Sequence, residues 1–237
     1  MLLQKRTVAV VIPAYNEAFI INEVVTSVQQ ALEQAEIAHE VLVIDDGSTD
    51  DTARLAEAAG AHVLRHLYNT GCGGATATGL RYAKRHNFEI SATFDADGQH
   101  CPNDLVLGIY AQRRNHADLL IGSRLINSAG MPLVKVLGNK WLSLITYYLF
   151  GIQVTDSQSG LRIFSHNALH RLTWKTYGYG FSSELLWRAK QKKLIIGEFP
   201  IKAVYTDYSI QKGQNNWNSI IIIQSLIKWR ILELFNE

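Results

Sequence analysis

The sequence predicts an α/β protein in which a mostly parallel β-sheet carries helices on both faces, within a single domain. Three observations lead to this fold class. The chain has 237 residues, of which 47% are apolar, so it can bury one substantial core. Short β-branched runs alternate with segments of helical periodicity through the first half of the chain. Polar motifs follow several of the predicted strands, where ligands of such sheets collect.

The predicted strands are short, apolar and rich in β-branched residues, which is typical of buried strands in a parallel sheet. Pro13 closes the first strand, and Pro200 within the last one favours an edge position. In chain order the strands cover residues 7–12, 40–45, 61–66, 90–97 and 118–124, followed by a polar and then strand-like segment at 154–165 and a strand at 195–205.

The predicted helices have apolar residues spaced to form one face. Ser48, Thr49 or Asp50 is expected to cap the second helix, and Gly60 is expected to end it. In chain order the helices cover residues 17–35, 51–60, 71–86, 139–151, 182–193 and 218–235.

Bulk composition excludes several classes of protein. A formal net charge of +2 is too small to favour nucleic acid as the main partner. The two cysteines, Cys72 and Cys101, form no disulfide framework and no paired zinc motif, so we expect a reducing compartment. The N-terminus lacks the features of a signal peptide, and no segment reaches the roughly 18 uninterrupted apolar residues of a spanning helix. We therefore expect a cytoplasmic protein, soluble or peripheral at the inner face of the cell membrane.

Three polar motifs follow predicted strands and define the candidate site. They are Pro-Ala-Tyr-Asn-Glu at 13–17, Asp-Asp-Gly-Ser-Thr-Asp-Asp at 45–51 and Asp-Ala-Asp-Gly-Gln-His at 95–100. Because the carboxyl ends of parallel strands meet at one edge of a sheet, we expect the three motifs to lie together. One acidic loop is weak evidence, but three loops at the same edge indicate a binding site.

Asp95 and Asp97 are one residue apart, so on a strand both carboxylates would face the same ligand. Their mutual repulsion indicates either a cation between them or a shared proton for acid–base catalysis. Mg²⁺ suits two carboxylates with the Gln99 amide oxygen, and His100 adds a nitrogen ligand if Mn²⁺ is bound.

One alternative to a metal site is a simple turn at Asp97–Gly98. Another is a phosphatase of the haloacid-dehalogenase type, although Gln99 stands where that loop carries Thr and the motif lies mid-chain.

Other polar residues near these loops have both a binding and a structural interpretation. Asp46 could accept hydrogen bonds from a base or ribose, or belong to a helix cap. Glu17 could bind the same ligand or favour the first turn of its helix through the dipole. The Gly-rich segment 71–79 could approach phosphate or simply allow close packing. Arg124 and Arg162 suit a phosphate ligand, with a solvated surface position as the alternative.

Taken together, the motifs resemble those of the family 2 glycosyltransferases of the GT-A fold. The matching segments are VVIPAYNE, VLVIDDGSTDDT, Asn69–Gly71, DADGQH and IGSR, in that order. Within that family the chain is most similar to the polyprenyl-phosphate sugar transferases of the dolichol-phosphate mannose synthase type, from about residue 7 to residue 205. The resemblance implies an inverting hexosyltransferase that uses a UDP- or GDP-linked sugar and either Mg²⁺ or Mn²⁺.

The resemblance also implies roles for individual residues. The nucleotide-sugar site would be formed by Pro13, Tyr15, Glu17, Asp46, Asp95 and Gln99, and the metal site by Asp95, Asp97 and Gln99. The segment at 154–164 is similar to the family's acceptor loop, Asp-x-x-Ser-Gly-x-Arg, and the segment at 180–189 to one that carries a glutamate. The implied catalytic groups are Asp97, Arg124, Asp156, Arg162 and Glu184, with Ser159 and Gly160 beside them.

The expected acceptor is a polyprenyl phosphate, which is already anionic and needs no general base. The alternative is a saccharide acceptor in cell-surface polysaccharide synthesis, for which Asp156 or Glu184 would be the base. The family's Arg-x-x-Gly-x-Ser-Lys motif is incomplete here, because Ile210 and Asn216 stand where Arg and Lys are expected, with Lys212 as a substitute for one of them. A nucleotide-sugar-binding protein without catalysis is a further alternative, which the complete metal motif argues against.

The predicted single domain, 1–237, divides into a nucleotide-sugar and metal-binding half at 1–125 and an acceptor half at 126–237. The aromatic helix at 139–151 and the amphipathic C-terminal helix at 218–235 are expected to lie on a membrane surface, to pack in the core, or to form a homo-oligomer contact.

Overall fold

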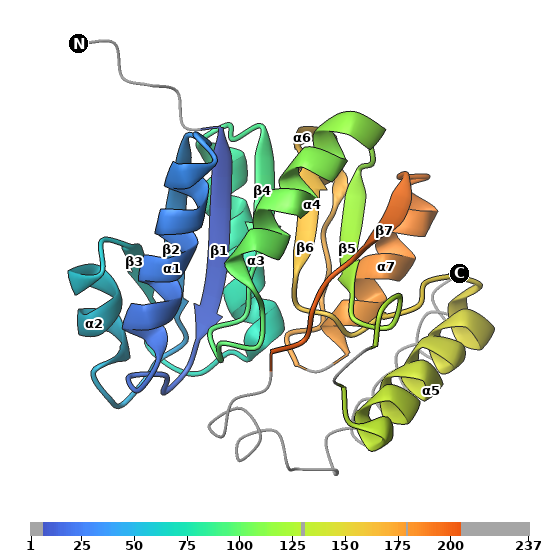
Figure 1. The fold of residues 1–237 in the computed structure, drawn as a ribbon, viewed down its shortest axis with the longest axis horizontal. Helices are drawn as coiled ribbons and strands as arrows, with labels where there is room; N and C mark the ends of the chain where they lie inside the picture. Colours follow the sequence, from blue (N-terminus) through green and yellow to red (C-terminus); the bar gives the residue numbers. More distant parts are fainter. Residues whose placement is uncertain (1–6, 129–130, 179, 205–237) are drawn as a thin grey trace.

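The computed structural model describes residues 7–128, 131–178 and 180–204 of the chain. These residues form a sheet with the strand order β3-β2-β1-β4-β6-β5-β7 (Figure 1). The strands are β1 (Val8–Ala14), β2 (His39–Asp45), β3 (His62–Arg65), β4 (Ile90–Thr93), β5 (Leu119–Ser123), β6 (Arg162–Ser165) and β7 (Ile196–Pro200). The helices are α1 (Ile21–Gln34), α2 (Thr52–Ala58), α3 (Cys72–Arg85), α4 (Pro102–Asn115), α5 (Leu133–Phe150), α6 (His166–Arg171) and α7 (Phe181–Gln191).

The sheet is parallel except at β6, which runs antiparallel to both of its neighbours, β4 and β5. The other pairs, β1 with β2 and β4, β2 with β3, and β5 with β7, are parallel. This confirms the predicted α/β fold with a mostly parallel sheet. The reversal of β6 has a functional effect, because it brings the start of that strand to the edge where the parallel strands end.

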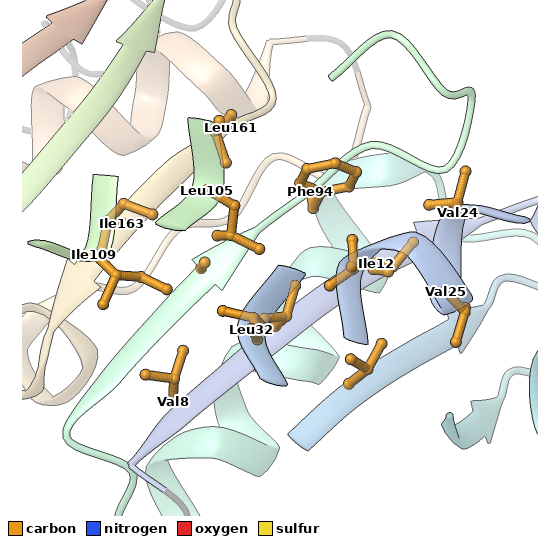
Figure 2. Packing of buried hydrophobic residues seen from close by; sticks show 14 of the residues in the cluster. Val8, Ile12, Val24, Val25, Leu32, Phe94, Leu105, Ile109, Leu161 and Ile163 are labelled. Carbon is orange, nitrogen blue, oxygen red and sulfur yellow. The ribbon is translucent and has the colours of Figure 1, made fainter. Parts of the chain in front are cut away.

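Alternate residues of each strand face opposite layers of helices. From β1, Val8, Val10 and Ile12 belong to the core cluster under α1 and α4, which Figure 2 shows from close by. Ala9 and Val11 belong to a second cluster, with α3, α6 and α7. Both faces of the sheet are therefore covered, as the continuous apolar run in β1 requires.

Several elements differ from their predicted extents. The fourth strand ends at Thr93, so Asp95 and Asp97 lie in the loop that follows and not on the strand itself. Helix α5 begins at Leu133, six residues before the predicted start, and ends as expected before Gly151. Helices α4 and α6 were not predicted, although Pro102 at the first helical position of α4 is a start signal. The predicted helix at 218–235 and the incomplete motif at 208–218 lie outside the described residues.

Helix α5 lies apart from both helical layers, at the lower right of Figure 1. Part of one face is buried through Val136, Leu142 and Thr146, whereas Trp141 and Tyr148 are 62% and 76% exposed. Among the described helices, none is both long and apolar enough to cross a membrane. An exposed aromatic face on this helix is the main unpaired apolar feature of the described surface.

Candidate active site

A cleft of about 550 Å³ opens at the edge of the sheet where the parallel strands end. It is lined by residues from the loops after β1, β2 and β4, so the predicted convergence of the three motifs is confirmed. Seven of the predicted site residues line it, namely Pro13, Tyr15, Glu17, Asp46, Asp95, Asp97 and Gln99.

Side chains of the loop after β2 hold the loop after β1 in place. The backbone N–H of Asn16 donates to Ser48 Oγ at 2.9 Å, and the Asn16 side-chain oxygen accepts from the Thr49 N–H at 2.9 Å. The Glu17 N–H donates to Thr52 Oγ1 at 2.8 Å. The predicted capping role of Ser48 and Thr49 is therefore wrong, since both serve this link between loops and α2 has no side-chain cap at its N-cap residue.

Asp46 lies in the wall of the cleft, with its carboxylate heavily hydrogen-bonded to the protein. It accepts from the Thr70 N–H and hydroxyl, from the Gly71 N–H at 2.7 Å, and it pairs with His66 Nδ1 at 2.7 Å. Burial alone would raise the pKa of Asp46, but these hydrogen bonds outweigh it and hold the pKa below its usual value. The carboxylate thus fixes the 69–71 segment as part of the cleft wall.

The Gly-rich segment at the start of α3 packs closely against another part of the chain. A Cβ atom on Gly71 or Gly73 would lie 2.7 or 2.8 Å from the Tyr177 carbonyl oxygen, and the Gly73 N–H donates to that oxygen at 2.9 Å. Gly71 also has a φ of +87°, which favours glycine. This close packing brings Gly178 into the cleft wall beside Cys72. Neither Gly178 nor Cys72 was a predicted site residue, although Cys72 lies in the Gly-rich segment 71–79 that the sequence singles out.

Asp95 lies deep in the cleft, where its side chain is still 37% exposed. One carboxylate oxygen, Oδ2, is 2.9 Å from His100 Nε2. Burial would raise the pKa of Asp95, but the hydrogen bond and charge of His100, with the charges of Arg124 and Arg162, lower it below its usual value. Asp95 is therefore ionised at neutral pH. His100 is bonded to Asp95, which disfavours its predicted role as a direct nitrogen ligand.

Asp97 is two residues from Asp95 and has the opposite electrostatic character. Burial and the Asp95 charge raise the pKa of Asp97 to about 6, although its carboxylate accepts the Gln99 N–H at 3.0 Å. This pair therefore concentrates negative charge that the protein leaves only partly balanced. The donor set consists of hard carboxylate oxygens, which fit Mg²⁺ or Mn²⁺. Within the described residues no three acidic, His or Cys side chains cluster as a complete cage, and the Gln99 amide, substrate and water are further oxygen ligands that such an ion accepts.

Arg124 and Asp156 form an ion pair between the segment that follows β5 and the segment that precedes β6. Arg124 Nε and Nη2 donate to the two carboxylate oxygens of Asp156 at 2.7 and 2.9 Å, and the Arg124 backbone N–H also donates to Oδ2. Asp156 is completely buried. Arg124 directly follows β5, and Asp156 precedes the start of the antiparallel strand β6, so both lie toward the edge of the sheet that carries the cleft.

Arg162 is a buried cation at the start of β6. Within the part of the chain that the structure describes, its Nε atom has no hydrogen-bond partner. Nη2 donates to the Ser157 carbonyl at 3.3 Å, and the guanidinium lies 5.3 Å from the centre of the Phe181 ring. Burial lowers the pKa of Arg162 to about 10, against the opposing effect of the Asp95 charge, so the group remains cationic at neutral pH. The predicted surface alternative is wrong for this residue.

Glu184 is not among the residues that line the cleft. Its carboxylate is fully buried and accepts the backbone N–H groups of Lys175 and Thr176, and it pairs with Arg188 Nε at 3.4 Å. This arrangement favours a structural role, in which Glu184 holds the 175–176 segment. Its prediction as a general base stays a prediction, without support from this geometry.

Comparison with known proteins identifies the family. The family model described as "Glycosyl transferase family 2" matches residues 9–173. A UDP-N-acetylglucosamine–dolichyl-phosphate N-acetylglucosaminyltransferase of Methanococcus voltae is 38% identical, over 97% of this chain and 96% of that protein. A polyprenol monophosphomannose synthase of Mycolicibacterium smegmatis is 29% identical, over 86% of this chain and 79% of that protein.

The fold is also that of a solved glycosyltransferase. The structure of glucosyl-3-phosphoglycerate synthase from Mycobacterium tuberculosis, in complex with Mn²⁺, uridine diphosphate and phosphoglyceric acid, superimposes with a TM-score of 0.70. The two sequences are 22% identical, and the match covers 95% of this chain and 78% of that one. The predicted GT-A-like fold is confirmed. With the family match over 9–173 and its relatives, these findings show that the chain belongs to glycosyl transferase family 2 and is a glycosyltransferase.

Proposed function

We propose that this glycosyltransferase is metal-dependent and inverting, and moves a hexose from a UDP- or GDP-sugar to a polyprenyl phosphate. The observation that carries the proposal is the partly balanced acidic pair, Asp95 and Asp97, at the base of a cleft formed by three strand-end loops. The relative in Methanococcus voltae, which acts between a UDP-sugar and a dolichyl phosphate by its name, supports the same donor and acceptor classes.

The donor would bind along the cleft. Tyr15, which is 44% exposed, offers a ring face for the base, and Pro13 and Glu17 line the cleft beside it. Asp46 supports this pocket through the 69–71 segment, since its oxygens already accept protein hydrogen bonds. These contacts suit uridine and guanosine alike, so the binding experiment includes both UDP and GDP.

Asp95 and Asp97, with Gln99, are the residues that would hold Mg²⁺ or Mn²⁺. When bound, the ion would neutralise charge on the diphosphate leaving group. His100 and Gln99 hold the two carboxylates in place before any ligand arrives, through the contacts at 2.9 and 3.0 Å. Burial and the Asp95 charge both raise the pKa of Asp97, so the ionised pair opposes folding.

The acceptor side favours a nucleophile that is already anionic. Both candidate bases, Asp156 and Glu184, are completely buried, and their carboxylates are bonded to arginine or backbone groups. A sugar hydroxyl would need a free base, whereas a lipid phosphate needs none. Arg124 and the buried Arg162 supply positive charge to this side of the site, which suits a phosphate. The saccharide-acceptor alternative therefore lacks an open base among its predicted residues.

Helix α5 would bring the protein to the surface of the membrane that holds a polyprenyl acceptor. Its exposed apolar residues recur every three or four positions and form one stripe, namely Leu133, Leu137, Trp141, Leu144 and Tyr148. The helix has two lysines and no acidic residue, so an anionic lipid surface complements it. A contact between two copies of the chain is the alternative use of the same stripe.

The test is calorimetric binding of UDP and of GDP, each with and without Mg²⁺ or Mn²⁺, to wild type, Asp97→Ala and the control Asp51→Ala. Asp51 is an exposed acid paired with Arg54, so its loss matches the charge change away from the acidic pair. We expect metal-dependent binding of one nucleotide, lost in Asp97→Ala and kept in Asp51→Ala. Absence of binding for both nucleotides would contradict the proposal.

The acceptor is tested separately by sugar transfer from the bound donor type to a short polyprenyl phosphate, in detergent, against a glycan. Transfer to the lipid phosphate alone is expected. Transfer only to the glycan would replace the proposed acceptor while leaving the donor site intact.

A further inference from the structure

The surroundings of His100 give its contact with Asp95 a more specific meaning. It is only 4% exposed, its Nε2 atom lies 2.9 Å from Asp95 Oδ2, and its buried Nδ1 atom has no hydrogen-bond partner among the described residues. Its ring packs edge-on against Phe94, with the ring centres 5.5 Å apart. A bridge to Ala203 fixes its backbone from the opposite side. The imidazole is thus held rigidly, with a single polar contact.

His100 contributes one hydrogen bond to Asp95. A carboxylate oxygen only accepts hydrogen bonds, so the contact at 2.9 Å is one in which His100 Nε2–H donates to Asp95 Oδ2. This N–H donor orients the carboxylate of Asp95 within the cleft.

Gly160 closes the other side of the Asp95 carboxylate. A Cβ atom at Gly160 would lie 2.0 Å from Oδ2 and 2.1 Å from Oδ1, far inside any permitted contact. The Gly160 carbonyl is itself fixed, because it accepts the Thr93 hydroxyl at 2.6 Å. The carboxylate therefore lies directly against the backbone of the 156–162 segment, and that segment reaches the site only because position 160 has no side chain.

We propose that His100 is a positioning residue, which fixes Asp95 between its Nε2–H and Gly160 in one orientation that accepts the divalent cation. This inference rests on the proposed metal-dependent function, and it assigns His100 the role of a support for Asp95, not of a ligand. Without the donor, Asp95 would gain rotational freedom and lose part of its readiness for the ion. Outer hydrogen-bond partners of metal-binding carboxylates commonly change metal affinity by about 10- to 100-fold.

The experiment measures Mn²⁺ binding by electron paramagnetic resonance, in the presence of UDP and, separately, GDP. His100→Phe keeps a ring against Phe94 and removes the donor, whereas His100→Gln keeps an N–H donor of similar reach. His62→Phe is the matched control, since His62 Nδ1 pairs with Glu40 at the same 2.9 Å on β3, separated from β4 by two strands. Nucleotide binding in chelator and the melting temperature are measured for every variant.

We expect His100→Phe to weaken Mn²⁺ binding by about tenfold or more, with metal-free nucleotide affinity unchanged. His100→Gln should recover most of that affinity, and His62→Phe should match wild type. Gly160→Ala should also weaken Mn²⁺ binding, because its methyl group displaces the same carboxylate. Gly160→Ala therefore tests the positioning of Asp95 even if His100→Phe does not fold.

The outcomes separate this inference from the proposed function. Wild-type Mn²⁺ affinity in both His100→Phe and Gly160→Ala would overturn the positioning role and leave the metal-dependent transferase intact. A loss in His100→Gln equal to that in His100→Phe would also overturn it, because the donor would then be irrelevant. If wild type binds no Mn²⁺ with either nucleotide, the proposed function fails and the inference falls with it.

Discussion

The loops after β2 and after β4 each place an aspartate in the wall of the same cleft, but they shift the pKa of that aspartate in opposite directions. Asp46, in the first loop, accepts hydrogen bonds from Thr70, Gly71 and His66, and its pKa is lowered. Asp97, in the second loop, accepts one backbone N–H from Gln99, and burial with the Asp95 charge raises its pKa to about 6.

The opposite pKa shifts distinguish a structural acid from a ligand-binding acid within one pocket. The carboxylate of Asp46 is satisfied by the fold, so its charge stabilises the native state. The charge on Asp97 opposes folding, which is characteristic of an acid that binds a ligand.

Asp97→Asn should lower sugar transfer by about 100-fold or more, because one of two charged oxygen donors at the leaving group is lost. In metal-free buffer at pH 8 the same variant should melt at a higher temperature than wild type, since repulsion between Asp95 and Asp97 is removed. Transfer assays and calorimetric scans measure the two effects. A variant that is both inactive and less stable would mean that Asp97 is structural, like Asp46.

Asp46→Asn should lower the free energy of unfolding by about 2 kcal/mol at pH 7, because N–H and O–H donors around the 69–71 segment lose a charged acceptor. Denaturant unfolding measures the loss. At a temperature where both variants are folded, nucleotide binding should weaken much less in Asp46→Asn than in Asp97→Ala. A stable Asp46→Asn protein that fails to bind nucleotide would reverse the assignment and make Asp46 a direct ligand.

The pH dependence of stability should differ between the two aspartates. The pKa of Asp46 is lowered in the folded state, so its contribution is present above the unfolded value of about 3.9 and is lost as pH falls below it. The pKa of Asp97 is raised, so metal-free wild type is favoured at low pH and loses that stability as pH rises through about 6.

Unfolding curves recorded between about pH 4 and pH 8, a range that includes the titration of Asp97 but lies above that of Asp46, should therefore show a decline up to about pH 6 that Asp97→Asn lacks. Asp46→Asn should keep this decline. An equal decline in wild type and Asp97→Asn would remove the electrostatic basis of the comparison between the two loops.

Much of the cleft follows from the sequence because the parallel-strand rule is geometric. Once the runs at 7–12, 40–45 and 90–97 are strands of one sheet, their following loops must share an edge, whatever their exact ends. The strand signals were strong because buried strands need β-branched residues on both faces. Because the strand ends at Thr93, Asp95 lies in the loop that follows it, and this loop is still at the same edge of the sheet.

Other features depend on partners that are remote in the chain. Ser48 has the local signature of a helix cap, but the Asn16 N–H, 32 positions away, takes its hydroxyl. Glu184 looks like a site residue by its motif, yet the Lys175 and Thr176 amides occupy its carboxylate. Gly178 lines the cleft next to Tyr177, whose carbonyl accepts the Gly73 N–H of α3. Sequence patterns describe what a residue is able to do, and tertiary neighbours decide which of those uses it has.

The reversed strand β6 has a topological consequence for how such an enzyme can change. Because β5 and β6 are antiparallel neighbours, the whole segment 124–161, with α5 inside it, is in effect one long hairpin loop. It leaves the sheet and returns to it at the same edge, without crossing either face. Replacement of residues 125–155 would leave the ladders of the sheet paired and would keep Gly160 against Asp95. The middle of this loop is thereby topologically separable from the strand-end loops that line the cleft.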